Sequence, residues 1–214
     1  MKIVFLDRDG VINAFPGDGK YVTRVKDFHL LSRSQEAIKL LTEAGFAIFV
    51  ISNQAGVGKG VYSREKLKQI TRKFVQEIKA SGGRLAGVYY CTHRSTAGCD
   101  CRKPEIGNIR KALDSIGKTV RAAKGAFFVG DTKSDIFAGY NAKCKTILVL
   151  SGRAQRSEAR SWGIKPDFIA KDLLAALPII LGDREPALNR VREHERYLKK
   201  NHIRMRTRVR YNTV

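Results

Sequence analysis

The chain opens with a short apolar run, Lys2-Ile3-Val4-Phe5-Leu6, that leads directly into Asp7-Arg8-Asp9-Gly10. Residues two apart in a strand point to the same side, so a strand ending here presents Asp7 and the turn that carries Asp9 together at its carboxyl end. In α/β proteins this edge of the sheet is where ligands bind. Of two carboxylates at such an edge, one can act as a nucleophile while the other transfers protons. The motif therefore predicts a buried strand with a reactive site at its end.

Taken alone, this fragment is equally compatible with a strand that ends in an ordinary Asp-Gly turn, and three later segments favour the reactive site. The apolar run 46–51 ends in polar residues 52–54, and the run 126–129 ends in Gly130-Asp131-Thr132-Lys133-Ser134-Asp135. Between these runs, Arg102-Lys103-Pro104 places a fixed cation before a predicted helix. Polar groups that follow separate strands meet at one edge of a parallel sheet, so we expect these residues to share one site.

Apolar runs and helical patterns alternate along most of the chain. Continuous apolar runs at 2–6, 46–51, 85–90, 126–130 and 146–150 predict strands buried on both faces, and 168–169 can add a short sixth strand. Helical patterns occupy about 32–45, 63–80, 106–116, 135–141 and 172–181. This alternation predicts an α/β fold with a doubly wound, Rossmann-like parallel sheet.

Two helix starts carry capping signals. Ser32-Arg33-Ser34-Gln35 predicts a capping box, and Ser63 predicts the N-cap of the following helix. The glycine-rich stretch 56–60 lacks the Gly-Lys-Ser/Thr ending of a phosphate-binding loop, so we interpret it as a flexible turn.

The organisation and charge of the chain bound what it can bind. No segment is long enough for a separate cap domain, so we expect loops to cover an open site, with one catalytic domain over residues 1–183. A basic extension over 184–214 holds ten Lys or Arg and three Glu, and the formal net charge of the whole chain is +21. Such a charge suits multiply anionic substrates and equally favours nucleic acid, so it does not decide between them.

The expected location of the protein follows from the same features. No stretch reaches the roughly 18 to 20 apolar residues of a membrane span, and the chain enters a predicted core strand without a signal peptide. We therefore expect a cytoplasmic protein without a membrane partner. We also expect a monomer.

Three of the four cysteines lie in one loop with a histidine. Cys91, His93, Cys99 and Cys101 supply three thiolates and an imidazole within eleven residues, the tetrahedral set that zinc prefers. A full shell of protein ligands makes such a Zn²⁺ structural, although coincident cysteines in a surface loop are the alternative. Because the loop runs directly into Arg102 and Lys103, the ion is expected to anchor the cation at the site.

The four strand-end and lysine motifs, in this order, resemble the haloacid dehalogenase superfamily of phosphotransferases. With the zinc loop included, residues 6–13, 52–56, 91–104 and 129–135 resemble the D-glycero-D-manno-heptose 1,7-bisphosphate phosphatases. They are also similar to the histidinol-phosphate phosphatases, which share the zinc loop. The resemblance covers about residues 2–180 and implies a Rossmann-like core without a cap domain.

The resemblance also implies roles for the carboxylates. Asp7 is implied to be the nucleophile that forms an aspartyl-phosphate, and Asp9 the general acid and then the base. Mg²⁺ is implied to be held by the Asp7 carboxylate, the Asp9 main-chain carbonyl and Asp131. Asp135 is implied either to orient Lys103 or a metal-bound water, or to be a carboxylate at a helix N-terminus that the helix dipole favours.

Substrate contacts are implied in the same way. Ser52 and Lys103 are implied to bind the transferring phosphoryl oxygens. The remainder of the substrate is implied to be recognised by Tyr21, Asn53, Gln54 and Arg102.

The function that we expect is therefore a Mg²⁺-dependent phosphatase acting on a small phosphorylated sugar, converting D-glycero-D-manno-heptose 1,7-bisphosphate to the 1-phosphate. The alternatives are a histidinol-phosphate phosphatase, a nucleic-acid end phosphatase, and an RNA-binding protein that uses the basic surface. Nucleic acid is not favoured, because Tyr197 and Tyr211 are the only stacking candidates in the basic extension.

Overall fold

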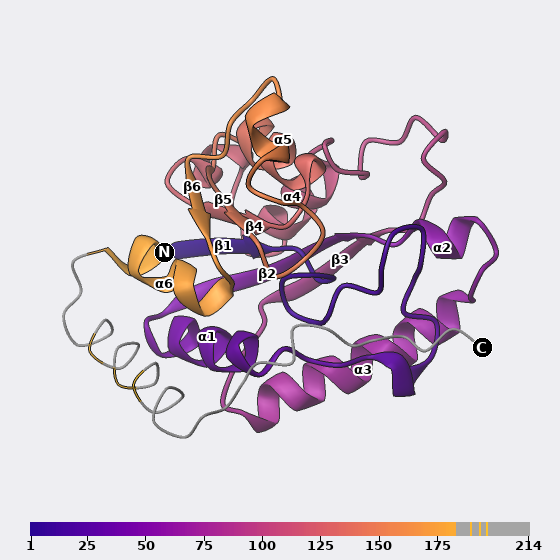
Figure 1. The fold of residues 1–214 in the computed structure, drawn as a ribbon, viewed down its shortest axis with the longest axis horizontal. Helices are drawn as coiled ribbons and strands as arrows, with labels where there is room; N and C mark the ends of the chain where they lie inside the picture. Colours follow the sequence, from indigo (N-terminus) through magenta and orange to yellow (C-terminus); the bar gives the residue numbers. More distant parts are fainter. Residues whose placement is uncertain (183–188, 190–192, 194–195, 197–214) are drawn as a thin grey trace.

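The computed structural model describes residues 1–182 together with Asn189, Glu193 and Arg196 (Figure 1). Apart from these three residues, the predicted basic extension at 184–214 lies outside the described residues. The division of the chain at residue 183 therefore stays a prediction.

The core of the protein is a six-stranded parallel sheet with strand order β3-β2-β1-β4-β5-β6. The strands are β1 (Lys2–Leu6), β2 (Phe46–Asn53), β3 (Gly87–Cys91), β4 (Phe127–Gly130), β5 (Lys145–Val149) and β6 (Phe168–Ala170). In β1, Leu6 lies opposite Val50 of β2 and Val129 of β4. This register brings the residues that follow all three strands to one edge, and it confirms the predicted doubly wound sheet with its sixth strand.

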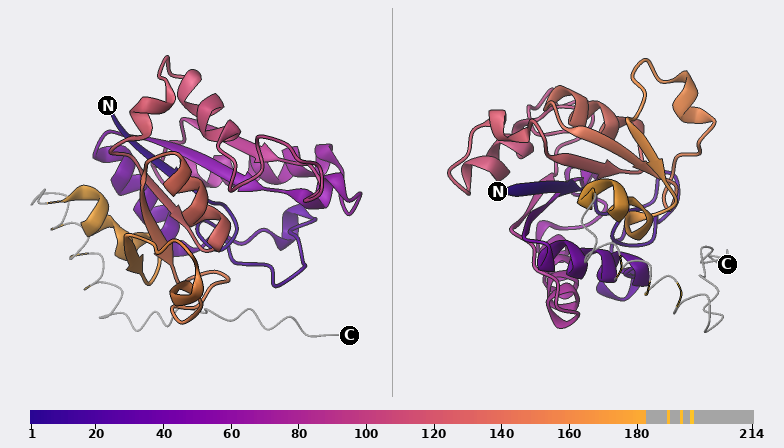
Figure 2. Two further views of the ribbon diagram at one scale, coloured as in Figure 1. Left: turned by 90° about the horizontal axis from the view of Figure 1, so that it is seen from above. Right: turned by 90° about the vertical axis from the view of Figure 1, so that its left-hand side faces the viewer.

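Helices cover both faces of the sheet (Figures 1 and 2). They are α1 (Ser32–Glu43), α2 (Ala55–Gly58), α3 (Arg64–Ala80), α4 (Gly107–Asp114), α5 (Lys133–Asn141) and α6 (Leu173–Leu181), with short 3₁₀ helices at Val25–Asp27, Val120–Ala123 and Glu158–Ser161. Residues of α1, α3 and α6 pack in one apolar cluster, and residues of α4 and α5 pack in a second cluster on the other face. Among the described residues, no helix is both long and apolar enough to cross a membrane.

The helix starts correct two predictions. Ser63 caps α3 as predicted, with its hydroxyl 3.1 Å from the Lys66 amide. The predicted capping box at Ser32 is wrong, because α1 has Leu31 at its N-cap and the Ser34 hydroxyl instead donates to the Val11 carbonyl. The prediction of a flexible turn after β2 is also wrong in part, since residues 55–58 form the short helix α2.

A buried ion pair joins α1 to the start of α6, and both helices lie on the same face of the sheet. The Arg33 guanidinium of α1 lies 2.6 Å from the Asp172 carboxylate, and both side chains are less than one-tenth exposed. Asp172 is also the N-cap of α6 and accepts a hydrogen bond from the Ala175 amide at 2.9 Å. One carboxylate therefore caps α6 and neutralises a buried cation.

Removing this carboxylate is expected to be costly. Asp172→Ala removes the carboxylate that pairs with the buried Arg33 guanidinium and that caps α6, so the free energy of unfolding should fall by about 3 to 5 kcal/mol. The exposed pair Arg24–Asp27 serves as the control, because Asp27→Ala removes a surface ion pair and should lower the free energy of unfolding far less. Denaturant unfolding of both variants measures the difference, and equal losses would contradict the prediction.

Candidate active site

The predicted site residues converge on one cleft at the carboxyl edge of the sheet. The cleft has a volume of about 210 Å³ and lies over the ends of β1, β2 and β4. Its lining includes the predicted residues Asp7, Asp9, Tyr21, Ser52, Asn53, Arg102, Lys103 and Asp131. Gln54 is the one predicted catalytic, substrate or Mg²⁺ residue that is not part of this lining.

A buried lysine links two of the carboxylates. The Lys103 ammonium lies 2.8 Å from Asp7 Oδ1 and 2.6 Å from Asp135 Oδ1, and it donates to the Ile51 carbonyl at 2.8 Å. Burial opposes the charge on Lys103, but the carboxylates of Asp135 and Asp7 outweigh burial and raise its pKa. Burial raises the pKa of Asp7 to about 6, although Lys103 acts in the opposite direction. The site therefore holds a charged lysine against a carboxyl group that ionises near neutral pH.

The carboxylates offer a site for a divalent cation. Oxygens of Asp7, Asp131 and Asp135 all lie within 4.8 Å of one another. Asp131 Oδ1 is buried without a hydrogen-bond partner, whereas its Oδ2 accepts from the Arg153 amide at 2.7 Å. Burial, followed by repulsion from Asp135 and Asp7, raises the pKa of Asp131. Hard oxygen ligands with an unsatisfied buried lone pair fit Mg²⁺.

Two glycines make room for this carboxylate. A Cβ on Gly10, whose φ is +85°, would lie 2.2 Å from Asp131 Oδ2, and a Cβ on Gly152 would lie 2.0 Å from the same atom. Any side chain at either position would displace the carboxylate, so both glycines are required by the close approach of Asp131.

Both alternatives predicted for Asp135 are present in the structure. Its Oδ2 accepts from the Thr132 amide at 2.9 Å and from the Thr132 hydroxyl at 2.6 Å, in a capping box at the start of α5. Its Oδ1 pairs with Lys103. Asp135 thus joins the α5 N-terminus to the lysine of the site.

Asp9 does not belong to the carboxylate cluster of Asp7, Asp131 and Asp135, and its side chain is held by other neighbours. Its carboxylate accepts from Arg8 Nη2 at 2.9 Å, from Asn13 Nδ2 at 2.9 Å and from Gln54 Nε2 at 2.8 Å. Sequence analysis gave Arg8 no role, yet it is fully buried. Its place between Asp7 and Asp9 was the available signal, because successive residues of an extended segment point to opposite sides, and an arginine that points into the protein needs a partner.

The loop before α4 is fixed to β2 and carries an unsatisfied cation. The Asn53 side chain makes two hydrogen bonds of 3.1 Å with the main chain of Lys103. Arg102 lines the cleft, and its Nη1 is buried without a hydrogen-bond partner. Sequence analysis did not identify Arg153, which also lines the cleft and pairs with Asp18 at 2.7 Å. The unpartnered Nη1 of Arg102 can bind an anionic group of a ligand.

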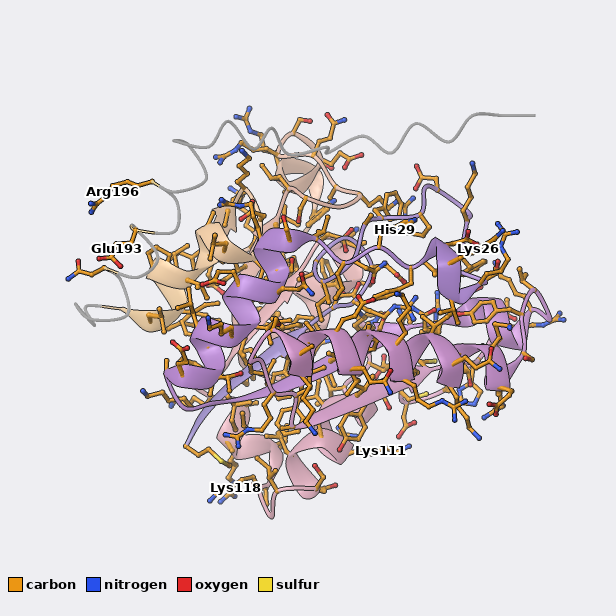
Figure 3. All side chains as sticks on the ribbon, turned by 90° about the horizontal axis from the view of Figure 1, so that it is seen from below. Lys26, His29, Lys111, Lys118, Glu193 and Arg196 are labelled. Atoms are coloured by element: carbon orange, nitrogen blue, oxygen red, sulfur yellow. The ribbon has the colours of Figure 1, made fainter. Side chains whose placement is uncertain are left out.

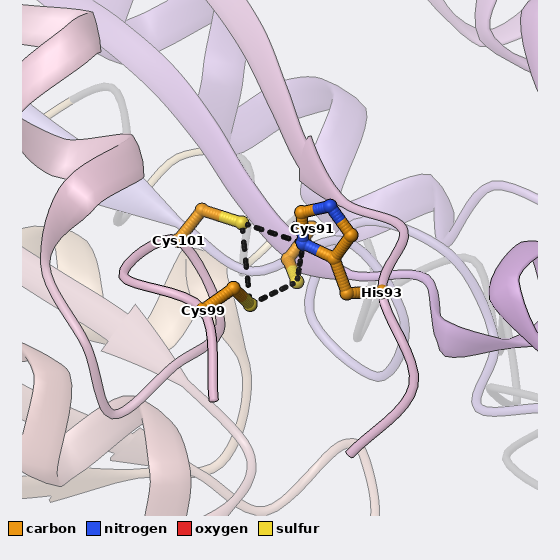
Figure 4. Close-up of side chains that lie close together, drawn as sticks. All are labelled: Cys91, His93, Cys99 and Cys101. Atoms are coloured by element: carbon orange, nitrogen blue, oxygen red, sulfur yellow. Dashed lines mark hydrogen bonds between the residues drawn. The ribbon is translucent and has the colours of Figure 1, made fainter. Parts of the chain in front are cut away.

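The predicted zinc ligands lie together in space (Figure 4). The Cys99 sulfur lies 3.6 Å from the sulfurs of Cys91 and Cys101, and His93 Nδ1 lies 3.3 Å from Cys101 and 3.8 Å from Cys91. Tetrahedral zinc with ligands at about 2.0 to 2.3 Å requires ligand separations of roughly 3.3 to 3.8 Å, so the four atoms are compatible with this ion.

Comparisons with known proteins agree with this geometry. Residues 100–176 match a family model described as HAD-hydrolase-like. The D-glycero-β-D-manno-heptose-1,7-bisphosphate 7-phosphatase of Neisseria meningitidis serogroup A is 33% identical over 157 residues, which cover 73% of this chain and 81% of that protein. The enzyme of the same name from Pseudomonas putida is 32% identical over 179 residues, which cover 83% of this chain and 97% of that protein.

A solved structure shows the same relationship. The crystal structure of D,D-heptose 1,7-bisphosphate phosphatase from B. bronchiseptica, complexed with magnesium and phosphate, superposes with a TM-score of 0.77 at 29% identity. The match covers 85% of this chain and 98% of that one. The chain belongs to the D,D-heptose 1,7-bisphosphate phosphatase family of haloacid dehalogenase-like hydrolases.

Proposed function

We propose that this protein is a Mg²⁺-dependent phosphatase that removes the 7-phosphate of a D-glycero-D-manno-heptose 1,7-bisphosphate through an aspartyl-phosphate on Asp7. The observation that carries the proposal is the buried Asp7 at the end of β1, with Lys103 at 2.8 Å and the unsatisfied oxygen of Asp131 in the same cleft. The names of the similar enzymes and the magnesium and phosphate in the B. bronchiseptica structure support it.

The carboxylates would divide the reaction between them. Asp7 forms a bond to phosphorus while the ester P–O bond breaks, and the leaving oxygen takes a proton from Asp9. A water molecule then attacks phosphorus, Asp9 accepts its proton, and Asp7 and inorganic phosphate are released. The carboxylates of Asp7 and Asp131, with the Asp9 main-chain carbonyl, would hold Mg²⁺, which offsets repulsion between the nucleophile and the phosphate.

The phosphoryl oxygens would be bound by Ser52 and Lys103. Ser52 is buried and its hydroxyl oxygen accepts from Gln54 Nε2 at 3.2 Å. Since that contact uses a lone pair of the oxygen, the O–H donor of Ser52 is left for a phosphoryl oxygen. Lys103 would contribute its charge to the same group.

Arg102 favours a bisphosphate over histidinol phosphate as the substrate. Its buried and unpartnered Nη1 would bind the second phosphate, and Tyr21 would contact the sugar from the loop between β1 and α1. Histidinol phosphate has no second phosphate that could bind this nitrogen. We therefore rank it below the bisphosphate, as the alternative substrate.

A nucleic-acid function remains the alternative from another class. Figure 3 shows Lys111 and Lys118 on the α4 side of the molecule and Lys26 on the opposite side, and all three are exposed. These three lysines therefore do not belong to one binding strip. The predictions of a monomer and of a role for the basic extension are not addressed by the described residues.

The nucleophile can be tested by substitution. Asp7→Asn removes the attacking oxygen's charge, so phosphate release from heptose 1,7-bisphosphate should fall by roughly 10⁴-fold or more. Asp114→Asn, an exposed residue at the end of α4, is the control and should keep full activity. Near-normal turnover by Asp7→Asn would contradict the covalent mechanism.

The buried carboxylates predict a pH-dependent stability in Mg²⁺-free protein. Because the folded-state pKa of Asp7 is raised from 3.8 to about 6, the folded state binds its proton more tightly than the unfolded state. The stabilisation is present below about pH 4 and is lost as the pH rises through about 6. Urea unfolding without Mg²⁺ should show this decline, and either Mg²⁺ or Asp7→Asn should reduce it. A decline of equal size in all three samples would assign it to other groups.

We propose that the ion in the cysteine–histidine loop is structural Zn²⁺. Cys99→Ser should lower the melting temperature and the activity, because the loop continues directly into Arg102 and Lys103. Cys144→Ser is the matched control, since Cys144 is a buried cysteine outside the cluster. Elemental analysis should find about one zinc per chain in the wild type and in Cys144→Ser. Its absence from active wild-type protein would defeat the proposal.

A further inference from the structure

The carboxylate of Asp9 is oriented by side chains that do not line the cleft. Arg8 and Gln54, which donate to it, are at most 1% exposed, and neither they nor Asn13 belong to the cleft lining. A group that must meet the leaving oxygen of a substrate is thus aimed from inside the protein. Because Gln54 donates to Asp9 Oδ2, the contacts that hold the Gln54 side chain also set the position of that oxygen.

The amide of Gln54 has only one orientation that satisfies its neighbours. Its Oε1 accepts from the Tyr62 hydroxyl at 2.5 Å and from Arg8 Nη2 at 3.2 Å. An arginine can only donate, so the amide oxygen must face Arg8 and the NH₂ group must face the other way. That NH₂ group lies 2.8 Å from Asp9 Oδ2 and 3.2 Å from Ser52 Oγ. One amide therefore bridges the predicted acid and the predicted phosphoryl-binding hydroxyl.

Tyr62 connects this amide to the loop over the cleft. Its ring centroid lies 6.2 Å from that of Tyr21, which lines the cleft. Both rings pack on Gly56, where a Cβ would lie 2.4 Å from Tyr62 and 2.9 Å from Tyr21. Contacts thus run without interruption from Tyr21 through Tyr62 and Gln54 to Asp9.

We infer that Tyr62 and Gln54 are positioning residues, which hold Asp9 ready to protonate the leaving group and link it to the Tyr21 loop. This inference rests on the proposed phosphatase function and gives Gln54 a role other than the predicted substrate contact. When the ester bond breaks, the departing oxygen takes the proton of Asp9. A poorly placed Asp9 slows the departure of a basic alkoxide, whereas a weakly basic aryl oxide departs without that proton.

The test compares two leaving groups in Gln54→Met and Tyr62→Phe. Methionine has nearly the shape of glutamine without its polar groups, and phenylalanine keeps the ring that packs on Tyr21. With heptose 1,7-bisphosphate, kcat/KM, which reports the steps through departure of the leaving group, should fall roughly 10- to 100-fold. With 4-nitrophenyl phosphate, kcat/KM should fall several-fold less. Competitive inhibition by inorganic phosphate should be unchanged in Tyr62→Phe, which does not remove the contact of Gln54 with Ser52.

The control is Tyr89→Phe, which removes a tyrosine hydroxyl from β3, where the ring packs on Phe49 away from this network. It should retain wild-type activity on both substrates. Equal losses on the two substrates with weakened phosphate inhibition, or no loss in Tyr62→Phe, would overturn the inference alone. Wild-type protein that hydrolyses neither ester in the presence of Mg²⁺ would overturn the proposed function and the inference with it.

Discussion

The contact of Lys103 with Asp7 and Asp135 is the interaction on which the rest of the site depends. Three carboxylates, including Asp131, approach within 4.8 Å of one another in a buried setting, where burial and repulsion raise the pKa values of Asp7 and Asp131. A single ammonium at 2.8 and 2.6 Å offsets two of them. The third carboxylate retains an unsatisfied oxygen, which is the part of the site that a divalent cation would complete.

The position of Lys103 is set by contacts with β2 and by the residues that precede it in the chain. Asn53 binds its main chain from β2, and the Ile51 carbonyl accepts from its ammonium. On the N-terminal side, the residue before Arg102 is Cys101, one of the four clustered cysteine and histidine side chains. Zn²⁺ bound by this cluster would therefore affect the chemistry without contacting substrate, because it would fix the residue two positions before the lysine.

The amino-acid sequence alone predicts the strands, the residues that follow them, and clusters of residues at short spacings. Continuous apolar runs mark the strands, and a parallel sheet brings the ends of β1, β2 and β4 together, so the pattern is sufficient to assign Asp7, Ser52 and Asp131 to one edge. The spacing of cysteines around His93 is similarly informative, because four potential metal ligands within one short loop can reach one another.

Contacts between distant segments are not predictable in this way. The pairing of Asp135 with Lys103 is one of the roles that the family resemblance implies, but no local pattern indicates it, and in the structure it coexists with the capping box of α5. The family resemblance implies that Gln54 contacts substrate, but its side chain turns into the protein toward Arg8 and Tyr62. A strand-end motif locates a residue at the correct edge, whereas its side-chain direction depends on partners that the motif does not contain.

The most direct measurement of the central claim is to identify the phosphorylated residue. Acid quenching of the enzyme during turnover of heptose 1,7-bisphosphate, followed by peptide mass spectrometry, should find a phosphoryl group on Asp7. The adduct should increase in Asp9→Asn, in which activation of the hydrolytic water is impaired, and be absent from Asp7→Asn. Phosphate release that continues without any adduct on Asp7 in either wild type or Asp9→Asn, or an adduct on another residue, would contradict the account.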